Sequence, residues 1–379
     1  MQRNDKCYCG SDIKYKKCHF LLESKLKNLN TYKTSKPLPH EIHHSFRDAK
    51  HYEICLAEGI DGCTEKITNA HTVPRSSSLK AISKDGHLYT FNSDDYLGFH
   101  NSKGKTTVSK IGIRTASTFS GFCSIHDNSL FQSLEKKEFV TSDEQMFMLF
   151  YRAFSMELYK KLATKRAYPL MLRQVLAIED FLHFCDCKQR YESMIKGVNQ
   201  ALKICGDLHA ELNTAIKAKK YDRIRYYSIR IEDKLPILGV GAFAPLYSLY
   251  GEQIQDIFEA TYIEYLNLSC LIDRDGNSWI NYTWLDELNS KSKKFVSDIQ
   301  KLPNDEQVRI SLNLLLNRIE NVYMSIDFWD NLNEFDKIKV IETFNRSLDE
   351  SQKLSTTYTL EKYFPIQNIR VVEKRSNIF

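Results

Sequence analysis

The segment GFCSIHDNSLF, residues 121–131, decides how the middle of this 379-residue chain folds. Its Cys123 and His126 have the spacing of a ligand pair at the start of a helix, where residues three apart share one face. Upstream, Cys55 and Cys63 provide two further thiols. Thiolate and imidazole groups are the donors of tetrahedral zinc sites. We therefore expect these four residues to bind one Zn²⁺ ion.

The order of these ligands along the chain looks like a treble clef. In that architecture a zinc knuckle supplies two ligands, a short hairpin intervenes, and the start of a helix supplies the other two. On this reading Cys55 and Cys63 form the knuckle, and the segment NAHTVPRSSSL contributes to the hairpin. Seven residues separate the two cysteines, which is a longer knuckle than usual.

Residues 55–135 resemble the HNH nuclease family. In that family a histidine that begins a Pro-containing stretch acts as the general base, and His71, with Pro74 three residues later, stands at that place. The resemblance implies that His71 activates water as a neutral imidazole. It also implies that Asp127 or Asn128 ligates Mg²⁺ or Mn²⁺, which would offset the charge on the leaving oxygen. A long insertion between the two ligand-bearing segments departs from the family's pattern.

Similar Cys, AHT, DGH and FCxxHD segments occur in bacterial proteins, some of them linked to phage defence. The resemblance therefore implies a metal-dependent endonuclease that acts on DNA or RNA in antiphage defence. His87, in KDGHLY, is a further candidate for the site, but a turn followed by a strand explains this segment without chemistry. We therefore leave His87 outside the expected site.

A second set of metal ligands lies at the N-terminus, in the segment CYCGSDIKYKKCH. It comprises two closely spaced cysteines and an adjacent Cys-His pair: Cys7, Cys9, Cys18 and His19. A segment this short has no hydrophobic core, so metal binding would have to provide most of its folding free energy. The segment resembles the SEC-C motif, from which it departs at Asp12, where glycine is usual. We expect a second Zn²⁺ ion here, which makes two per chain.

The composition indicates an ordered globular protein with 42% hydrophobic and 12% aromatic residues. A net charge of +5 is too small to establish nucleic-acid binding by itself. The chain lacks a run of about 18 apolar residues, and its first twenty residues are basic and cysteine-rich rather than an apolar leader. We therefore expect a cytoplasmic protein without a membrane partner, whose ten cysteines serve mainly as metal ligands.

The predicted fold class is α+β, with four segments along the chain. Residues 1–20 form the SEC-C zinc module, 21–39 a linker, and 40–140 the HNH-like treble-clef domain. Residues 141–379 form a mainly helical body with a small antiparallel sheet at about 221–285. Ser142 is a candidate N-cap for the first long helix. Further helices are predicted over 191–219, 285–301, 306–324 and 336–348, and strands over 226–231, 262–272 and 279–284.

A second functional hypothesis belongs to a different class. The chain could be a non-catalytic, zinc-stabilised adaptor that recruits a protein partner through the SEC-C module and the helical body. The two hypotheses differ in whether His71 faces an open position near Asp127 or Asn128. Two other segments carry no expected site: Cys185 and Cys187 lack a partner pair, and GVGAFAP, residues 239–245, is a strand and turn rather than a phosphate loop.

Overall fold

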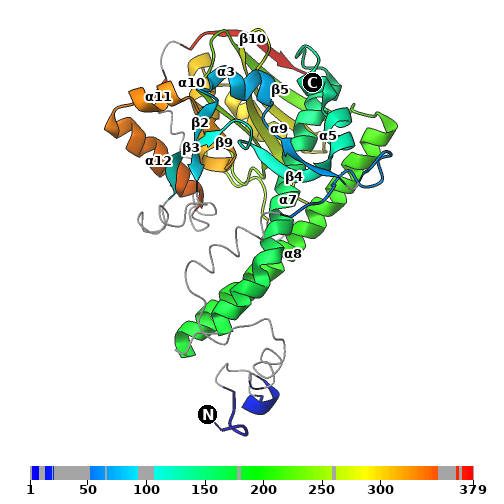
Figure 1. Ribbon diagram of the computed structural model, residues 1–379, viewed down its shortest axis with the longest axis vertical. Helices are drawn as coiled ribbons and strands as arrows, with labels where there is room; N and C mark the ends of the chain where they lie inside the picture. The colour runs from blue at the N-terminus through cyan, green and yellow to red at the C-terminus, as the bar shows by residue number, and fades with distance from the viewer. Residues whose placement is uncertain are drawn as a thin grey trace. The chain divides into compact units, whose positions relative to one another are not determined.

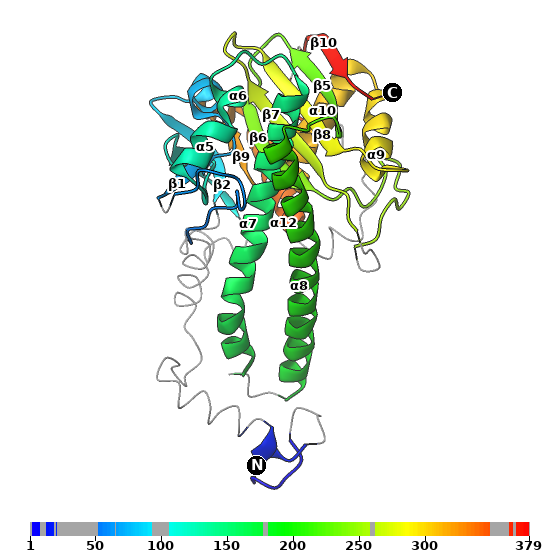
Figure 2. The same ribbon diagram turned by 90° about the vertical axis from the view of Figure 1, so that its right-hand side faces the viewer.

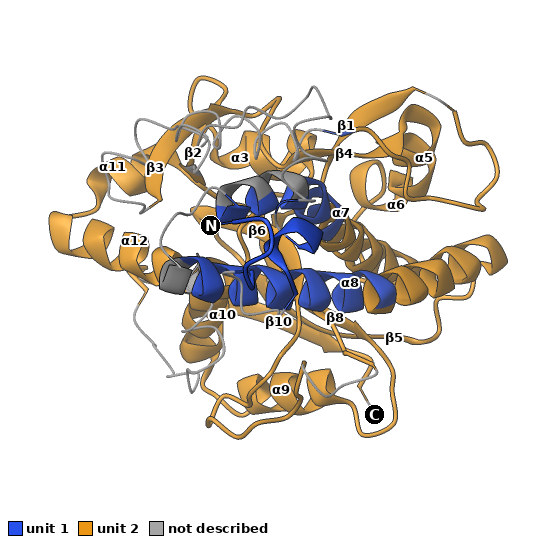
Figure 3. Cartoon of the chain, turned by 90° about the horizontal axis from the view of Figure 1, so that it is seen from below, with its two compact units in different colours: residues 1–52, 160–203 blue, residues 53–159, 204–379 orange. Residues whose placement is uncertain are grey.

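The computed structural model describes most of the chain. The described residues are 2–7, 13–18, 20, 52–64, 66–92, 106–176, 181–257, 262–348, 364–366 and 369–378. They divide into two compact units (Figure 3), one of residues 1–52 and 160–203 and one of residues 53–159 and 204–379. No helix among the described residues is long and apolar enough to cross a membrane.

The first unit contains an N-terminal turn and the outer halves of two long helices. The turn η1 (Tyr15–Lys17) follows a bridge between Lys6 and Lys14. The helices are α7 (Asp143–Leu176) and α8 (Phe181–Ala218), each of which runs from one unit into the other. Within this unit the Tyr168 hydroxyl donates to the Met194 carbonyl at 3.0 Å, which joins the two helices.

Helix α7 begins where the sequence predicted it. The Ser142 hydroxyl accepts a hydrogen bond from the Gln145 amide at 3.3 Å, which satisfies one of the free N–H groups of the first turn. The predicted apolar stripe is buried, with Met146 and Phe154 both fully covered. Helix α8 begins at Phe181, ten residues before the predicted start at 191. The buried residues of α7 up to Tyr159 belong to the second unit.

The second unit is built on one large antiparallel sheet (Figures 1 and 2). Eight of the described strands form it, in the order β10-β5-β8-β7-β6-β9-β2-β3. In chain order they are β2 (His87–Asn92), β3 (Thr107–Gly112), β5 (Ile224–Ile231), β6 (Ile237–Phe243), β7 (Leu266–Ile272), β8 (Ser278–Leu285), β9 (Val322–Met324) and β10 (Val371–Ser376). The α+β prediction is confirmed, but the small sheet predicted at 221–285 is only the centre of this larger one.

The centre of the sheet is closed by a turn that the sequence predicted. Between β7 and β8, the Asp273 carboxylate accepts hydrogen bonds from the amides of Asp275 and Asn277, at 3.0 and 2.9 Å. Gly276 adopts a φ of 89°, which glycine reaches without steric cost. Every residue of β7 and β8 is buried, so the centre of the sheet is covered on both faces.

One face of the sheet packs on α10 (Asn304–Arg318). The hydroxyl of Tyr227 bonds to the Gln307 side chain, and that of Tyr282 to Ser311, both at 2.6 Å. Strand β6 approaches this layer so closely that a Cβ atom at Gly239 would lie 3.0 Å from the Asn321 carbonyl oxygen. A glycine in a strand commonly marks such a close backbone approach. The segment GVGAFAP thus serves packing, as a strand.

In Figure 2 helices α7 and α8 lie in front of strands β6, β7 and β8. The ring of Phe139, which precedes α7, packs edge-on against Trp279, with the ring centroids 5.3 Å apart. The remaining helices of this unit are α3 (Lys80–Ile82), α5 (Ser124–Leu130), α6 (Gln132–Glu135), α9 (Lys291–Gln300), α11 (Ile326–Asn331) and α12 (Glu334–Leu348), with a π-helical turn η2 (Arg75–Leu79). The sheet therefore lies between layers of helices.

The helix predicted over 285–301 begins at Lys291, because Leu285 still belongs to β8. Two further predicted boundaries are corrected by the structure. The helix predicted over 306–324 ends at Arg318, because Ile319 is extended and the chain continues into β9, which pairs with both β6 and β2. The strand predicted over 262–272 begins at Leu266. In both cases pairing across the sheet overrides the local apolar pattern, which suits a buried helix and a buried strand alike.

Candidate metal centre and the adjoining polar site

The candidate metal centre is built on a two-stranded sheet that stands apart from the large one. Strand β1 (Ile67–His71) pairs antiparallel with β4 (Thr118–Cys123), so that Ile67 lies opposite Cys123. Helix α5 follows β4 directly, and the Cys123 side chain caps it by accepting from the His126 amide at 3.5 Å. Cys123 and His126 are therefore held one turn apart at the start of a helix, as their spacing predicted.

The structure brings the four predicted ligands of this centre together. The Sγ atoms of Cys55, Cys63 and Cys123 and a ring nitrogen of His126 all lie within 4.8 Å of one another. The Cys55 sulfur lies 3.3 Å from Nδ1 of His126. Cys123 and His126 are buried, whereas Cys63 is exposed. Three sulfurs and one imidazole form a donor set that fits tetrahedral Zn²⁺, so this cluster could hold a metal ion.

The orientation of His126 also suits a ligand. Its Nε2 lies 3.1 Å from the carbonyl oxygen of Asp61, so the proton belongs on Nε2 and Nδ1 keeps a lone pair directed at the sulfurs. Metal-binding histidines almost always donate their other N–H group to a carbonyl or carboxylate in this way. The loop that carries Asp61 is shaped by Gly62, whose φ of 89° favours glycine.

Backbone amides surround the sulfurs of the centre. Cys123 Sγ accepts from the amides of Thr64 and His126, each at 3.5 Å, and Cys55 Sγ accepts from the Cys123 amide at 3.4 Å. Burial acts to raise the pKa of Cys123, but these hydrogen bonds to its sulfur outweigh burial and lower the pKa to about 6. Burial raises the pKa of Cys55 to about 11. Cys123 is thus the first thiolate of the set, and the charge of that thiolate opposes ionisation of its neighbour.

The N-terminal set is described only in part. Cys7 is buried and donates its amide to the Ile13 carbonyl at 2.8 Å, and the Cys18 amide donates to the Tyr15 carbonyl at 3.1 Å. Cys9 and His19 lie outside the described residues. The Arg3 guanidinium stacks on the Phe20 ring at 4.4 Å, which adds a small contact around the turn.

His71 ends strand β1 opposite Thr118, outside the metal cluster. Its Nε2 lies 3.4 Å from the Ile113 carbonyl oxygen, so Nε2 carries the proton and Nδ1 is left as an acceptor. Burial lowers the pKa of His71 below 6.5 and outweighs the hydrogen bond to the Ile113 carbonyl, which acts to raise it. The ring is therefore neutral at pH 7, which is the form that can accept a proton.

Asp127 and Asn128 point in different directions from α5. The Asn128 amide donates to the Ser124 carbonyl at 2.8 Å and the residue is exposed, so it is bonded to its own helix. The Oδ1 atom of Asp127 is buried without a hydrogen-bond partner, and burial raises the pKa of its carboxyl group. Of the two predicted cation ligands, only Asp127 thus offers an inward-facing oxygen.

The sequence reasoning missed two charged residues beside Asp127. Arg152, on α7, is completely buried, and its Nη2 donates to Oε1 of Glu135 at 2.6 Å. The charges of both residues affect the pKa of His71 and of Asp127, so the four groups share one region. A signal existed in the sequence: Arg152 is the one charge between Gln145 and Met156, in an otherwise apolar or uncharged stretch.

A closed polar network lies directly after His71. The side-chain Nδ2 of Asn321 donates to the Thr72 hydroxyl at 2.6 Å, and the Tyr323 hydroxyl donates to the side-chain Oδ1 of Asn321 at 2.9 Å. The Ser117 amide donates in turn to the Tyr323 oxygen at 2.5 Å, and the Thr72 and Ser117 hydroxyls lie 2.5 Å apart. All four residues are buried. The network fixes both strands of the small sheet to β9 of the large one.

The other histidine and cysteine candidates lie outside the Cys55, Cys63, Cys123 and His126 cluster. His87 is exposed at the start of β2, after a turn in which Asp85 and Gly86 have positive φ angles. Cys185 and Cys187 lie two residues apart on α8, where side chains two apart do not face each other. Within the described parts of the chain, Cys55, Cys63, Cys123 and His126 are the only group of three or more His, Cys, Asp or Glu side chains close enough together to hold a metal ion.

Comparison with known families finds a match for one part of the chain. The architecture and the Cys/His cluster define a mixed α+β protein with a candidate metal centre. A family model, the SEC-C motif, matches residues 3–21, so the N-terminal segment is similar to a zinc-binding motif, as predicted. No curated protein and no solved structure matches the chain. The resemblance to HNH nucleases has no counterpart among these findings.

Proposed function

We propose that residues 53–135 form a zinc-stabilised treble clef whose exposed side hydrolyses phosphodiester bonds, as a metal-dependent endonuclease of the HNH-like class. The order of loop, β1, β4 and α5 around the four ligands supports this proposal. The observation that carries it is the position of His71. It ends β1 outside the zinc ligand set and shares one charged region with Asp127.

His71 has the state that a general base requires. Its ring is neutral, Nε2 is committed to the Ile113 carbonyl, and Nδ1 can take a proton from water. Asp127 would hold a Mg²⁺ or Mn²⁺ ion, which supplies charge compensation at the leaving oxygen when bound. The Ile113 contact fixes the ring in one orientation and one tautomer. Zinc at Cys55, Cys63, Cys123 and His126 would serve structure alone, because four protein ligands leave no open position.

The test is a cleavage assay with matched variants. We expect the purified protein to cut plasmid DNA, oligonucleotides or RNA in Mg²⁺ or Mn²⁺, and His71→Ala to retain its zinc and melting temperature. General-base catalysis contributes roughly a hundredfold to ten-thousandfold, so the variant should keep about 1% of the rate or less. His87→Ala is the control, because His87 is exposed and outside the site. Unchanged cleavage by His71→Ala would remove the proposed role, and loss of zinc would make His71 a ligand.

A second function has its own supporting observation. The SEC-C match covers a small terminal module, and Ile13 within it is 47% exposed beside lysines on both sides of the turn. The lysines give this module a positive face, which suits recruitment of an acidic protein partner. If no nucleic acid is cleaved with either cation, this adaptor function is preferred. Antiphage defence is the setting that we propose for the nuclease, on the sequence resemblance alone.

A further inference from the structure

Arg152 is the most unusual polar group among the described residues. It is completely buried, and two of its three guanidinium nitrogens, Nε and Nη1, have no hydrogen-bond partner. Buried polar groups are almost always paired, and a buried cation is paired more strictly still. The structure therefore keeps two desolvated donors without an acceptor, and each of them would form a two-donor edge with the Nη2 group that Glu135 occupies. A group held in this way is prepared for an anion.

The surroundings of Arg152 leave these two donors without a partner. The Phe131 ring covers one face of the guanidinium at 4.0 Å, a contact that uses no N–H donor. The one ion pair is made by Glu135, whose side chain is 40% exposed. Glu135 is also the last residue of α6, so its side chain stands at a helix end rather than inside a packed helix. The carboxylate is thus the movable partner and the arginine the fixed one.

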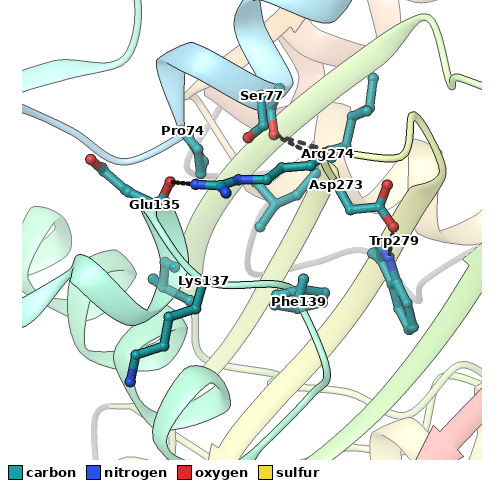
Figure 4. A pocket seen from close by; sticks show the side chains of 12 residues that line it. Pro74, Ser77, Glu135, Lys137, Phe139, Asp273, Arg274 and Trp279 are labelled. Carbon is teal, nitrogen blue, oxygen red and sulfur yellow. Dashed lines mark hydrogen bonds between the residues drawn. The ribbon is translucent and has the colours of Figure 1, made fainter.

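Glu135, the partner of Arg152, also lines a pocket with charged walls (Figure 4). Two cations, Lys137 and Arg274, and two carboxylates, Glu135 and Asp273, line this pocket. Arg274 donates to the backbone carbonyl of Glu135 at 2.9 Å, and in Figure 4 the Glu135 carboxylate points away from Arg274. The backbone of Glu135 is therefore anchored at the pocket wall, while its carboxylate occupies Arg152.

We propose that Arg152 is an anion-binding group of the site that contains His71 and Asp127, and that Glu135 occupies it in the ligand-free protein. The ligand class is a phosphate group, because a guanidinium edge matches two oxygens of a phosphate. That this phosphate belongs to a nucleic acid rests on the proposed function. A phosphate would displace the Glu135 carboxylate from Nη2 and bind Nη2 together with Nε, which form one edge of the guanidinium.

Binding of inorganic phosphate, measured by titration calorimetry, tests the proposal without any cleavage. Glu135→Gln removes the competing charge, and we expect it to tighten phosphate binding roughly tenfold, since a charge-assisted hydrogen bond is about twice as strong as a neutral one. Arg152→Met should weaken binding at least tenfold relative to the parent, on the order expected for losing charged hydrogen bonds. Arg225→Met is the control, because Arg225 pairs with Asp286 at 2.6 Å elsewhere in the same unit.

The opposite changes expected in phosphate affinity distinguish a binding role of the ion pair from a purely structural one. A purely structural ion pair predicts that both variants melt earlier and that neither changes phosphate affinity, and this result would overturn the proposal. If Arg152→Met does not fold, Arg152→Lys takes its place, because lysine keeps the positive charge but lacks the two-donor edge of the guanidinium. The decision then rests on Glu135→Gln, and an unchanged phosphate affinity in that variant refutes the proposal. His71→Ala should bind phosphate normally. Phosphate binding without nucleic-acid cleavage would therefore refute the nuclease function and leave the Arg152 site standing.

Discussion

The stability of the protein should fall between pH 6.5 and pH 4 through one buried histidine, His209 on α8. His209 is 4% exposed and lies between the rings of Tyr151 and Phe154. Its Nε2 is 2.8 Å from the Ser155 hydroxyl oxygen, and that hydroxyl donates to the Tyr151 carbonyl at 2.7 Å. Nε2 must therefore be the donor to Ser155, which the neutral ring can be. No carboxylate faces the ring in these contacts, so nothing compensates a positive charge there.

The magnitude follows from the shift in pKa. Burial lowers the pKa of His209 from 6.5 to about 4. Above pH 6.5 the histidine is neutral in the folded and the unfolded chain, and its contribution is complete. As the pH falls below 6.5, the unfolded chain takes up a proton that the folded chain refuses until about pH 4, so stability is lost over this window. At about pH 5 the loss is about 2 kcal/mol, and at pH 4 about 3 kcal/mol.

Urea unfolding of the parent and of His209→Gln, followed by tryptophan fluorescence, measures this loss. Gln can still donate to Ser155 but does not titrate. We expect the parent's stability advantage over the variant to shrink by about 2 kcal/mol between about pH 7 and about pH 5. Release of metal at low pH affects both proteins equally and cancels in the difference. A difference that does not change with pH would refute the reasoning.

Three further outcomes are expected. Cys123→Ser should lose one zinc ion by metal analysis and melt well below the parent, whereas Cys18→Ser should lose the N-terminal ion at an unchanged melting temperature; equal melting temperatures would contradict this. Gly239→Ala should destabilise by about 1–3 kcal/mol in urea unfolding, because its Cβ would lie 3.0 Å from a carbonyl oxygen. The control Gly197→Ala, on an exposed helix with nothing within 4 Å, should be neutral or stabilising. The rate of any cleavage should fall only when the pH drops below 6.5, since burial lowers the pKa of His71. A fall in rate that begins above pH 6.5 would argue against His71 as the base.

Local chemistry made part of the structure predictable. Ser142 and the apolar positions after it specify the start of α7, and Asp275-Gly276 specifies the turn before β8, because both signals act over a few residues. The spacing of Cys123 and His126 likewise follows from one helical turn. These features need no knowledge of what packs against them.

The rest depended on partners far away in the sequence. Strand β9 is three residues long and exists because β6 and β2 flank it, so its sequence was read as the end of a helix. Arg152 was missed because burial of a charge is decided by tertiary packing and not by helical periodicity. Glu135 has no distinguishing local pattern. Its importance comes only from the guanidinium to which it is bonded.

The chain leaves the small sheet to build part of the large one and then returns to the small sheet. Between β1 and β4 the chain leaves to build β2 and β3 at one edge of the large sheet, and the Thr72, Ser117 and Asn321 side chains lock the exit and the return. Cys55 and Cys63 can therefore meet Cys123 and His126 only when the long segment between them has closed into a loop. Contacts between residues so far apart in the sequence form slowly. Capture of a metal ion at this centre would then mark a late step of folding, so newly made chains would pass through a period with reactive, uncoordinated thiols.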